Sequence, residues 1–131
     1  MENNKKQEMG KGIHIISNLF GCKNQELLVS RKKLESLLTS SIERNELTIL
    51  RKDFYQFGEE EKSGITGYML LAESHVSIHT WPEPDNNNYI ALDIFVCNYS
   101  KDNTENARKI YQELLDSFQP TRKEETFLRR N

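Results

Sequence analysis

The strongest constraint on the fold is a run, residues 89–97, in which apolar side chains alternate with other side chains. Because successive side chains of a β-strand point to opposite faces, such a run buries one face of the strand and leaves the other accessible. This pattern is typical of an antiparallel sheet that is covered on one face only. The residues expected to face the core are Ile90, Leu92, Ile94 and Val96.

The remaining periodicity predicts two helices and further strands. Apolar residues at helical spacing predict one helix over 25–44, with Asn24 as its N-cap. A second helix is expected to start with a capping box formed by Asp102 and Glu105 and to end before Pro120. The first helix would bury Leu27, Leu34, Leu38 and Ile42, and the second Ala107, Ile110, Tyr111, Leu114, Leu115 and Phe118. The other expected strands are 12–20, 47–57, 65–72 and 75–82, with a short edge strand over 121–130.

This order of elements indicates an α+β fold, a two-layer sandwich in which two helices cover one face of an antiparallel β-sheet. The unbroken apolar run 65–72 predicts a buried strand of that sheet, and 84–88 predicts a turn. The chain is expected to be a single domain, 1–131, with a disordered polar tail at 1–10. Because hydrophobic residues make up 36% of the chain, the core is modest and a dimer interface would help to stabilise it.

Charge and composition argue against several functions. The formal net charge of −2 disfavours a nucleic-acid-binding protein. No apolar run is long enough to span a bilayer, and the N-terminus lacks an apolar signal core, so we expect no membrane association and a cytoplasmic location. Cys22 and Cys97 are expected to be free thiols. No His-x-x-x-His pair lies on a predicted helix and no Cys-x-x-Cys pair occurs, so no metal site is expected.

One segment concentrates groups that can move protons. It reads Glu73-Ser74-His75-Val76-Ser77-Ile78-His79-Thr80-Trp81-Pro82-Glu83 and contains two histidines, two serines and two carboxylates. It resembles the self-cleavage segment of the bacterial and archaeal S-adenosylmethionine decarboxylases. The resemblance extends over about residues 10–118 and includes Gly12-Ile13-His14, Phe20-Gly21-Cys22, Gly64-Ile65-Thr66-Gly67 and Asp93-Ile94-Phe95-Val96-Cys97.

The resemblance implies that the chain cuts its own backbone between Glu73 and Ser74. The Ser74 hydroxyl would attack the Glu73 carbonyl, and elimination from the resulting ester would leave a pyruvoyl group as the cofactor. The products would be a β chain, 1–73, and an α chain, 74–131. The substrate amine would then form a Schiff base with the pyruvoyl ketone, so that no external cofactor is required.

Two further residues carry catalytic roles in the resembling family. His79 matches the histidine that acts in processing, and we expect it to take the Cα proton of Ser74. Since a straight strand would place Ser74 and His79 on opposite faces, we expect the chain to bend at Ser74. Cys97 matches a cysteine that assists processing and protonates the substrate carbon after carbon dioxide leaves. His75 has no clear role, and Cys22 is expected to pack in the core.

Substrate recognition is expected from three residues. Glu83 matches a glutamate that hydrogen-bonds the ribose hydroxyls, and Phe57 matches an aromatic residue that stacks on adenine. Thr66 stands where the family commonly has a serine near the pyruvoyl group. The segments 58–63 and 84–88 are each about three residues longer than usual. Because they adjoin the substrate-contacting residues, the stacking residue could instead be Tyr55 or Phe54.

The function expected is decarboxylation of S-adenosylmethionine, which yields the aminopropyl donor for spermidine synthesis. An alternative keeps the pyruvoyl chemistry but changes the substrate to arginine or ornithine, as in other members of the superfamily. A second alternative is a non-processing dimeric binding module. The resemblance also implies a homodimer whose two sheets form a sandwich, with a small molecule as substrate.

Overall fold

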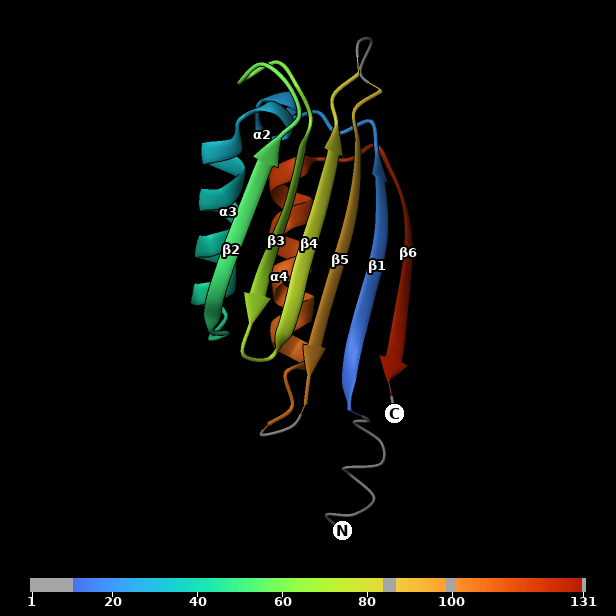
Figure 1. Cartoon of the computed structure of the whole chain (residues 1–131). Coiled ribbons are helices and arrows are strands. Elements are labelled where there is room, and N and C mark those ends of the chain that lie inside the picture. Colours follow the sequence, from blue (N-terminus) through green and yellow to red (C-terminus); the bar gives the residue numbers. More distant parts are fainter. Residues whose placement is uncertain (1–10, 84–86, 99–100, 131) are drawn as a thin grey trace.

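The protein is built as one sheet with helices on a single face (Figure 1). A computed structural model describes residues 11–83, 87–98 and 101–130. The tail expected at 1–10 and most of the turn expected at 84–88 lie outside the described residues. The two-layer α+β sandwich expected from the sequence is confirmed.

Neighbouring strands of the sheet are antiparallel, and their order is β2-β3-β4-β5-β1-β6. Figure 1 shows β2 and β6 at the two edges. The edge strand at the C-terminus pairs with β1 along its whole length, so it is longer than the short strand expected. The strands are β1 (Gly12–Phe20), β2 (Ile49–Gln56), β3 (Ile65–Leu71), β4 (Ser74–Trp81), β5 (Tyr89–Cys97) and β6 (Arg122–Arg130).

Side chains alternate between the two faces of the sheet, and one face packs against the helices. In β5 every second residue from Ile90 to Val96 is buried, as expected. The prediction that 65–72 forms a buried strand holds for only one of its faces. Tyr68 and Leu70 are 43% and 39% exposed, because they lie on the face opposite the helices.

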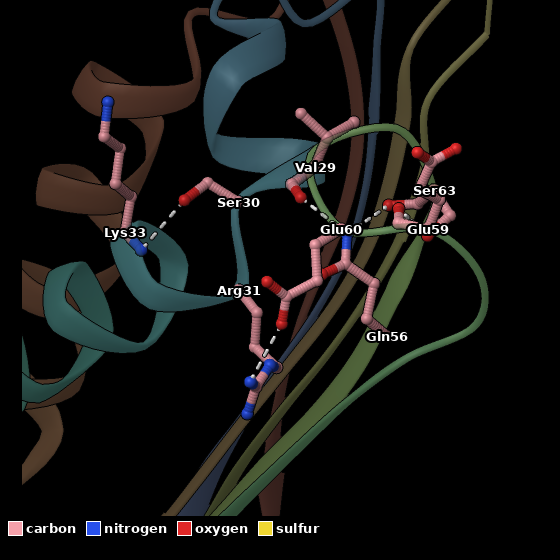
Figure 2. A network of polar contacts seen from close by, with 8 residues as sticks. All are labelled: Val29, Ser30, Arg31, Lys33, Gln56, Glu59, Glu60 and Ser63. Carbon is pink, nitrogen blue, oxygen red and sulfur yellow. Dashed lines mark hydrogen bonds and ion pairs between the residues drawn. The ribbon is translucent and has the colours of Figure 1, made fainter.

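The single helix expected over 25–44 is interrupted at Ser30. There α2 (Gln25–Val29) ends and α3 (Arg31–Arg44) begins. Ser30 has extended backbone angles, and its hydroxyl accepts a hydrogen bond from the backbone N–H of Lys33 at 3.2 Å (Figure 2). The serine thus satisfies an otherwise unpaired donor in the first turn and acts as the N-cap of α3.

The short helix α2 is attached to the sheet through Leu28. This side chain, rather than Leu27, is fully buried, because the break at Ser30 separates α2 from the stripe of α3. The hydroxyl of Thr80 in β4 donates to the Leu28 carbonyl at 2.7 Å. Asn24 occupies the N-cap position of α2 as expected, but its side chain donates to the Ser117 carbonyl and makes no capping bond.

The last helix, α4 (Thr104–Phe118), buries the apolar stripe predicted for it. The capping box expected from Asp102 and Glu105 does not form. Asn103 occupies the N-cap instead, and Asp102 accepts a hydrogen bond from the first backbone N–H of the helix at 2.9 Å. The helix ends before Pro120, as expected. In the described part of the chain, no helix is long and apolar enough to cross a membrane.

The face of the sheet opposite the helices is open, and we call it the open face (Figure 1). The register between strands places three histidines there, along with a row of aromatic rings at one end. Among the described residues nothing covers this face. Its large exposed apolar side chains are Ile16, Tyr55, Tyr68, Leu70, Trp81 and Leu128.

Candidate active site

The expected cleavage site lies in the tight hairpin between β3 and β4. Leu71 pairs with Ser74, so only Ala72 and Glu73 form the turn. Ser74 begins β4 with a φ of 137°. Side chains other than glycine rarely adopt a positive φ of this size, and such a residue costs about 1–3 kcal/mol unless its surroundings hold it. Ser74 is therefore a point of local backbone strain at the start of β4.

The surroundings hold Glu73 at both its carbonyl and its carboxylate. The backbone N–H of Cys97, at the end of β5, donates to the Glu73 carbonyl oxygen at 2.7 Å. The backbone N–H of Thr48 donates to the Glu73 carboxylate at 3.0 Å. A donor fixed on a carbonyl oxygen stabilises the negative charge that develops there when a nucleophile attacks. The sequence did not indicate this contact of the Cys97 backbone with Glu73.

The hydroxyl of Ser74 contacts the neighbouring imidazole. Its Oγ lies 3.1 Å from Nδ1 of His75, a residue to which the sequence assigned no role. The His75 ring meets the rings of Phe95 and His14 edge-on, with centroids 5.9 Å and 6.4 Å away. Nε2 of His14 in turn lies 2.9 Å from the Asp93 carboxylate. In the sequence, only the adjacency of Ser74 and His75 could have suggested the contact between their side chains.

His79 lies toward the other end of β4, on the open face. Its Nδ1 is 2.6 Å from the hydroxyl of Thr66 in β3, directly across the strand pair. Next to it is a hollow of about 460 Å³, lined in part by Phe57 and Trp81. Trp81 is 47% exposed, and its ring centroid lies 6.2 Å from that of His79. The sequence had assigned Trp81 no role in binding.

Ser74 and His79 do not meet within one chain. Both belong to β4, in which each residue pairs regularly with β5. Five residues along a strand span about 16 Å. The expectation that a bend at Ser74 would bring the two side chains together is wrong, because the strand continues straight after its strained first residue.

The aromatic candidates for substrate stacking differ in accessibility. Phe54 is buried on the helix side of the sheet, where a Cβ added at Gly67 would lie 2.3 Å from its ring, so it is not available. Phe57 is 65% exposed beside the hollow, and Tyr55 is 61% exposed, with its ring centroid 5.4 Å from that of Phe57. Glu83 is exposed just beyond the end of β4.

The longer segment 58–63 folds back against the junction of α2 and α3 (Figure 2). The Gln56 amide donates to the carbonyls of Val29 and Ser63 at 2.6 and 3.1 Å. Arg31 pairs with Glu60 at 3.2 Å. These contacts hold the insertion beside the helices, and the Phe57 backbone N–H still closes the loop on the Gly64 carbonyl at 3.0 Å.

The two cysteines occupy different environments. Cys22 is fully buried, and burial raises the pKa of its thiol to about 11. It therefore packs as a small apolar side chain, as expected. Cys97 is half-buried at the end of β5, on the open face and next to the hairpin between β3 and β4. Both are free thiols.

Across the described ranges, no cluster of three or more metal-binding side chains occurs.

The fold and this arrangement define a class: an α+β sandwich in which a strained serine begins a strand of the sheet, and histidines and a cysteine lie on its open face. The sequence model described as S-adenosylmethionine decarboxylase matches residues 13–131. The S-adenosylmethionine decarboxylase proenzyme of Thermoplasma acidophilum is 36% identical over 114 residues, which cover 87% of this chain and 79% of the relative. The proenzyme of Archaeoglobus fulgidus is 38% identical over 109 residues, covering 83% and 88%.

A solved structure agrees with the sequence comparison. The crystal structure of the adenosylmethionine decarboxylase from Aquifex aeolicus superposes with a TM-score of 0.79 at 26% identity, and the match covers 93% of this chain and 92% of the other. The chain belongs to the S-adenosylmethionine decarboxylase family.

Proposed function

We propose that the protein is a self-processing, pyruvoyl-dependent decarboxylase of S-adenosylmethionine. The observation that carries the proposal is the strained Ser74, whose preceding carbonyl is held by the Cys97 N–H at 2.7 Å. Relatives of similar sequence are named S-adenosylmethionine decarboxylase proenzyme, which supports both the substrate and a precursor that must be processed.

In this proposal the chain cleaves between Glu73 and Ser74. The Ser74 hydroxyl attacks the Glu73 carbonyl, and the amide becomes an ester. His79 then takes the Cα proton of Ser74, the ester is eliminated, and hydrolysis leaves a pyruvoyl group with release of ammonia. The single domain is thereby divided into a β chain, 1–73, and an α chain, 74–131. Strain at Ser74 supports the first step because the rearrangement relieves it.

The residues around Ser74 fit a pyruvoyl group at the start of β4. Such a group would supply a ketone that binds the substrate amine and an acceptor for the electrons released with carbon dioxide. The Cys97 thiol is half-buried beside this position and can donate the proton that the substrate carbon needs afterwards. After cleavage, the backbone N–H of Cys97 would continue to orient the new chain end at Glu73.

A homodimer completes the site in this proposal. Ser74 at the start of β4 and Cys97 at the end of β5 lie at one end of the sheet, and His79 with its hollow lies about 16 Å away from Ser74 toward the other end. A two-fold axis through the middle of the open face would set each end against the opposite end of the second subunit. The exposed apolar side chains of the open face support such an interface. Ser74 would then react with His79 of the partner subunit.

The hollow beside His79 supports a nucleoside substrate. Phe57 and Trp81 offer exposed aromatic surface for the stacking of a purine, and Thr66 is hydrogen-bonded to His79 at its edge. Glu83 lies close by in the chain and is exposed, so its carboxylate is free to accept hydrogen bonds from ribose hydroxyls. Arginine and ornithine have neither a purine nor a ribose.

Release of carbon dioxide from carboxyl-labelled S-adenosylmethionine, arginine and ornithine tests the substrate. We expect release from S-adenosylmethionine only. Glu83→Gln should lower kcat/KM about ten- to a hundredfold, since a hydrogen bond to a charged group contributes about 1.5–3 kcal/mol. Self-cleavage should be unaffected by this change. Glu43→Gln, an exposed carboxylate on α3, is the control for the lost charge and should behave as the wild type.

Release from arginine or ornithine alone would show that the substrate is wrong while the pyruvoyl chemistry survives. Failure to cleave and to release carbon dioxide from any of the three would favour a binding module. The proposal includes a cytoplasmic location, which the free thiols support, and a place in spermidine synthesis, which the resemblance to the family implies.

A further inference from the structure

We infer that His75 is the base that takes the hydroxyl proton of Ser74 in the first step of self-cleavage. The inference rests on the proposed function and assigns a role to a residue that neither the sequence pattern nor the comparisons explain. Nδ1 of His75 lies 3.1 Å from Oγ of Ser74, within the reach of a proton transfer. An imidazole is the side chain best suited to accept a proton near neutral pH.

The packing of His75 fixes its direction. Its ring meets Phe95 edge-on at 5.9 Å and His14 edge-on at 6.4 Å. Phe95 itself lies under the guanidinium of Arg130, 4.5 Å from the ring centroid. His14 is tied by its Nε2 to the Asp93 carboxylate at 2.9 Å. Because His14 in β1 and Phe95 in β5 both pack against the His75 ring, this imidazole has little freedom to turn away from Ser74.

The atoms balance without an outside reagent. As Oγ of Ser74 bonds to the Glu73 carbonyl carbon, its proton passes to Nδ1 of His75, and the carbonyl π electrons move onto the oxygen. That oxygen accepts the N–H of Cys97 at 2.7 Å, which stabilises the developing charge. When the tetrahedral centre collapses, the C–N bond breaks and the Ser74 nitrogen takes the proton from His75. The products are an ester and a free amine.

The position of His79 leaves the first proton transfer to His75. Within the chain, His79 is about 16 Å from Ser74 along the strand, and its Nδ1 is engaged by the Thr66 hydroxyl at 2.6 Å. The two histidines of β4 are therefore assigned to different steps of self-cleavage. His75 serves the rearrangement of its own chain, and His79 of the partner subunit serves the later removal of the Cα proton.

The test isolates ester formation. In a His79→Ala chain the elimination is blocked, so the ester accumulates, and hydroxylamine cuts it to release a fragment that begins with an intact Ser74. Adding His75→Phe keeps a packed ring but removes the base. We expect the rate of hydroxylamine-dependent cutting to fall on the order of a hundredfold or more. In a His75→Ala, His79→Ala chain, added imidazole should restore the rate, while the Phe variant should not respond.

Ser77→Ala in the His79→Ala background is the matched control, because Ser77 lies on the same face of β4 as His75 but does not touch Ser74. It should form ester at the unaltered rate, and circular dichroism should show every variant folded. An unchanged rate with His75→Phe would overturn the inference. So would a His79→Ala chain that forms no ester although the wild type cleaves itself. A wild type that never cleaves would instead remove the proposed function.

Discussion

At the scale of single residues, Cys97 presents two separate groups near the expected cleavage site. Its backbone N–H holds the Glu73 carbonyl oxygen at 2.7 Å, and its thiol lies half-buried on the open face. Only the thiol depends on the identity of the side chain. A substitution at this position therefore separates the two roles proposed for Cys97, stabilisation of the cleavage intermediate and donation of a proton to substrate.

We predict that Cys97→Ala still cleaves itself, more slowly, but turns over substrate poorly. The backbone donor remains in place, whereas loss of a general acid lowers a rate about 10²–10⁴-fold. Mass spectrometry gives the cleaved fraction, and carbon dioxide release per cleaved chain gives the turnover. Cys22→Ala, which removes the other thiol from the core, should keep its activity per cleaved chain. Full and lasting activity of Cys97→Ala would identify another group as the acid.

The candidate residues of the site could be named from the sequence, but their contacts could not. Ser74, His79 and Cys97 were expected from the resemblance to the family rather than from the strand pattern alone. The contact between Cys97 and Glu73 depends on the register of β4 against β5, in which Ser74 pairs with Val96. Neighbouring strands leave no trace of their register in a single sequence, apart from which face each residue occupies.

At the scale of elements, the strands and the apolar stripe of α4 follow from periodicity alone, whereas a break within a helix and the exposure of one face of a strand do not. The break at Ser30 was missed because apolar residues continue at helical spacing on both sides of it. The exposed half of β3 was missed because Tyr68 and Leu70 are apolar, although they lie on the open face. In a sequence, an apolar side chain on an exposed face of a sheet cannot be distinguished from one in the core.

The capping role of Ser30 can be measured directly. Ser30→Ala should lower the free energy of unfolding by about 1 kcal/mol, within the range of 0.5–2 kcal/mol found for N-cap serines. Urea denaturation of an uncleaved Ser74→Ala chain provides the measurement without interference from cleavage. Ser36→Ala, at an exposed position of α3, should leave the midpoint nearly unchanged or raise it slightly, since alanine favours helices. Equal effects at both positions would contradict a cap at Ser30.

At the scale of the whole molecule, the candidate residues lie toward the two ends of one strand. The expected cleavage site lies at the start of β4, and His79 lies about 16 Å further on. A face-to-face pair of open faces would join the halves from different subunits and bury the exposed apolar side chains at the same time. The sequence indicated a dimer through its lean core and the family resemblance, but it could not indicate how the site is divided.

Mixed dimers test this division. A Ser74→Ala chain lacks the nucleophile and a His79→Ala chain lacks the base for elimination, so each alone should yield no pyruvoyl product. When both are produced together with tags of different length, the His79→Ala chain should be cleaved, because its Ser74 faces His79 of the partner subunit. The Ser74→Ala chain should stay whole. If neither chain is cleaved in mixed dimers while the wild type is, Ser74 and His79 act within one subunit.

The mass of the purified wild-type protein tests the central claim most directly. The account predicts two species, a fragment that ends at Glu73 and a fragment in which a pyruvoyl group has replaced Ser74. The second fragment should resist Edman degradation, because it has no free amino group. The Ser74→Ala chain, purified in parallel, should give one uncleaved mass. A wild-type protein that still shows only the uncleaved mass after prolonged incubation would contradict the account.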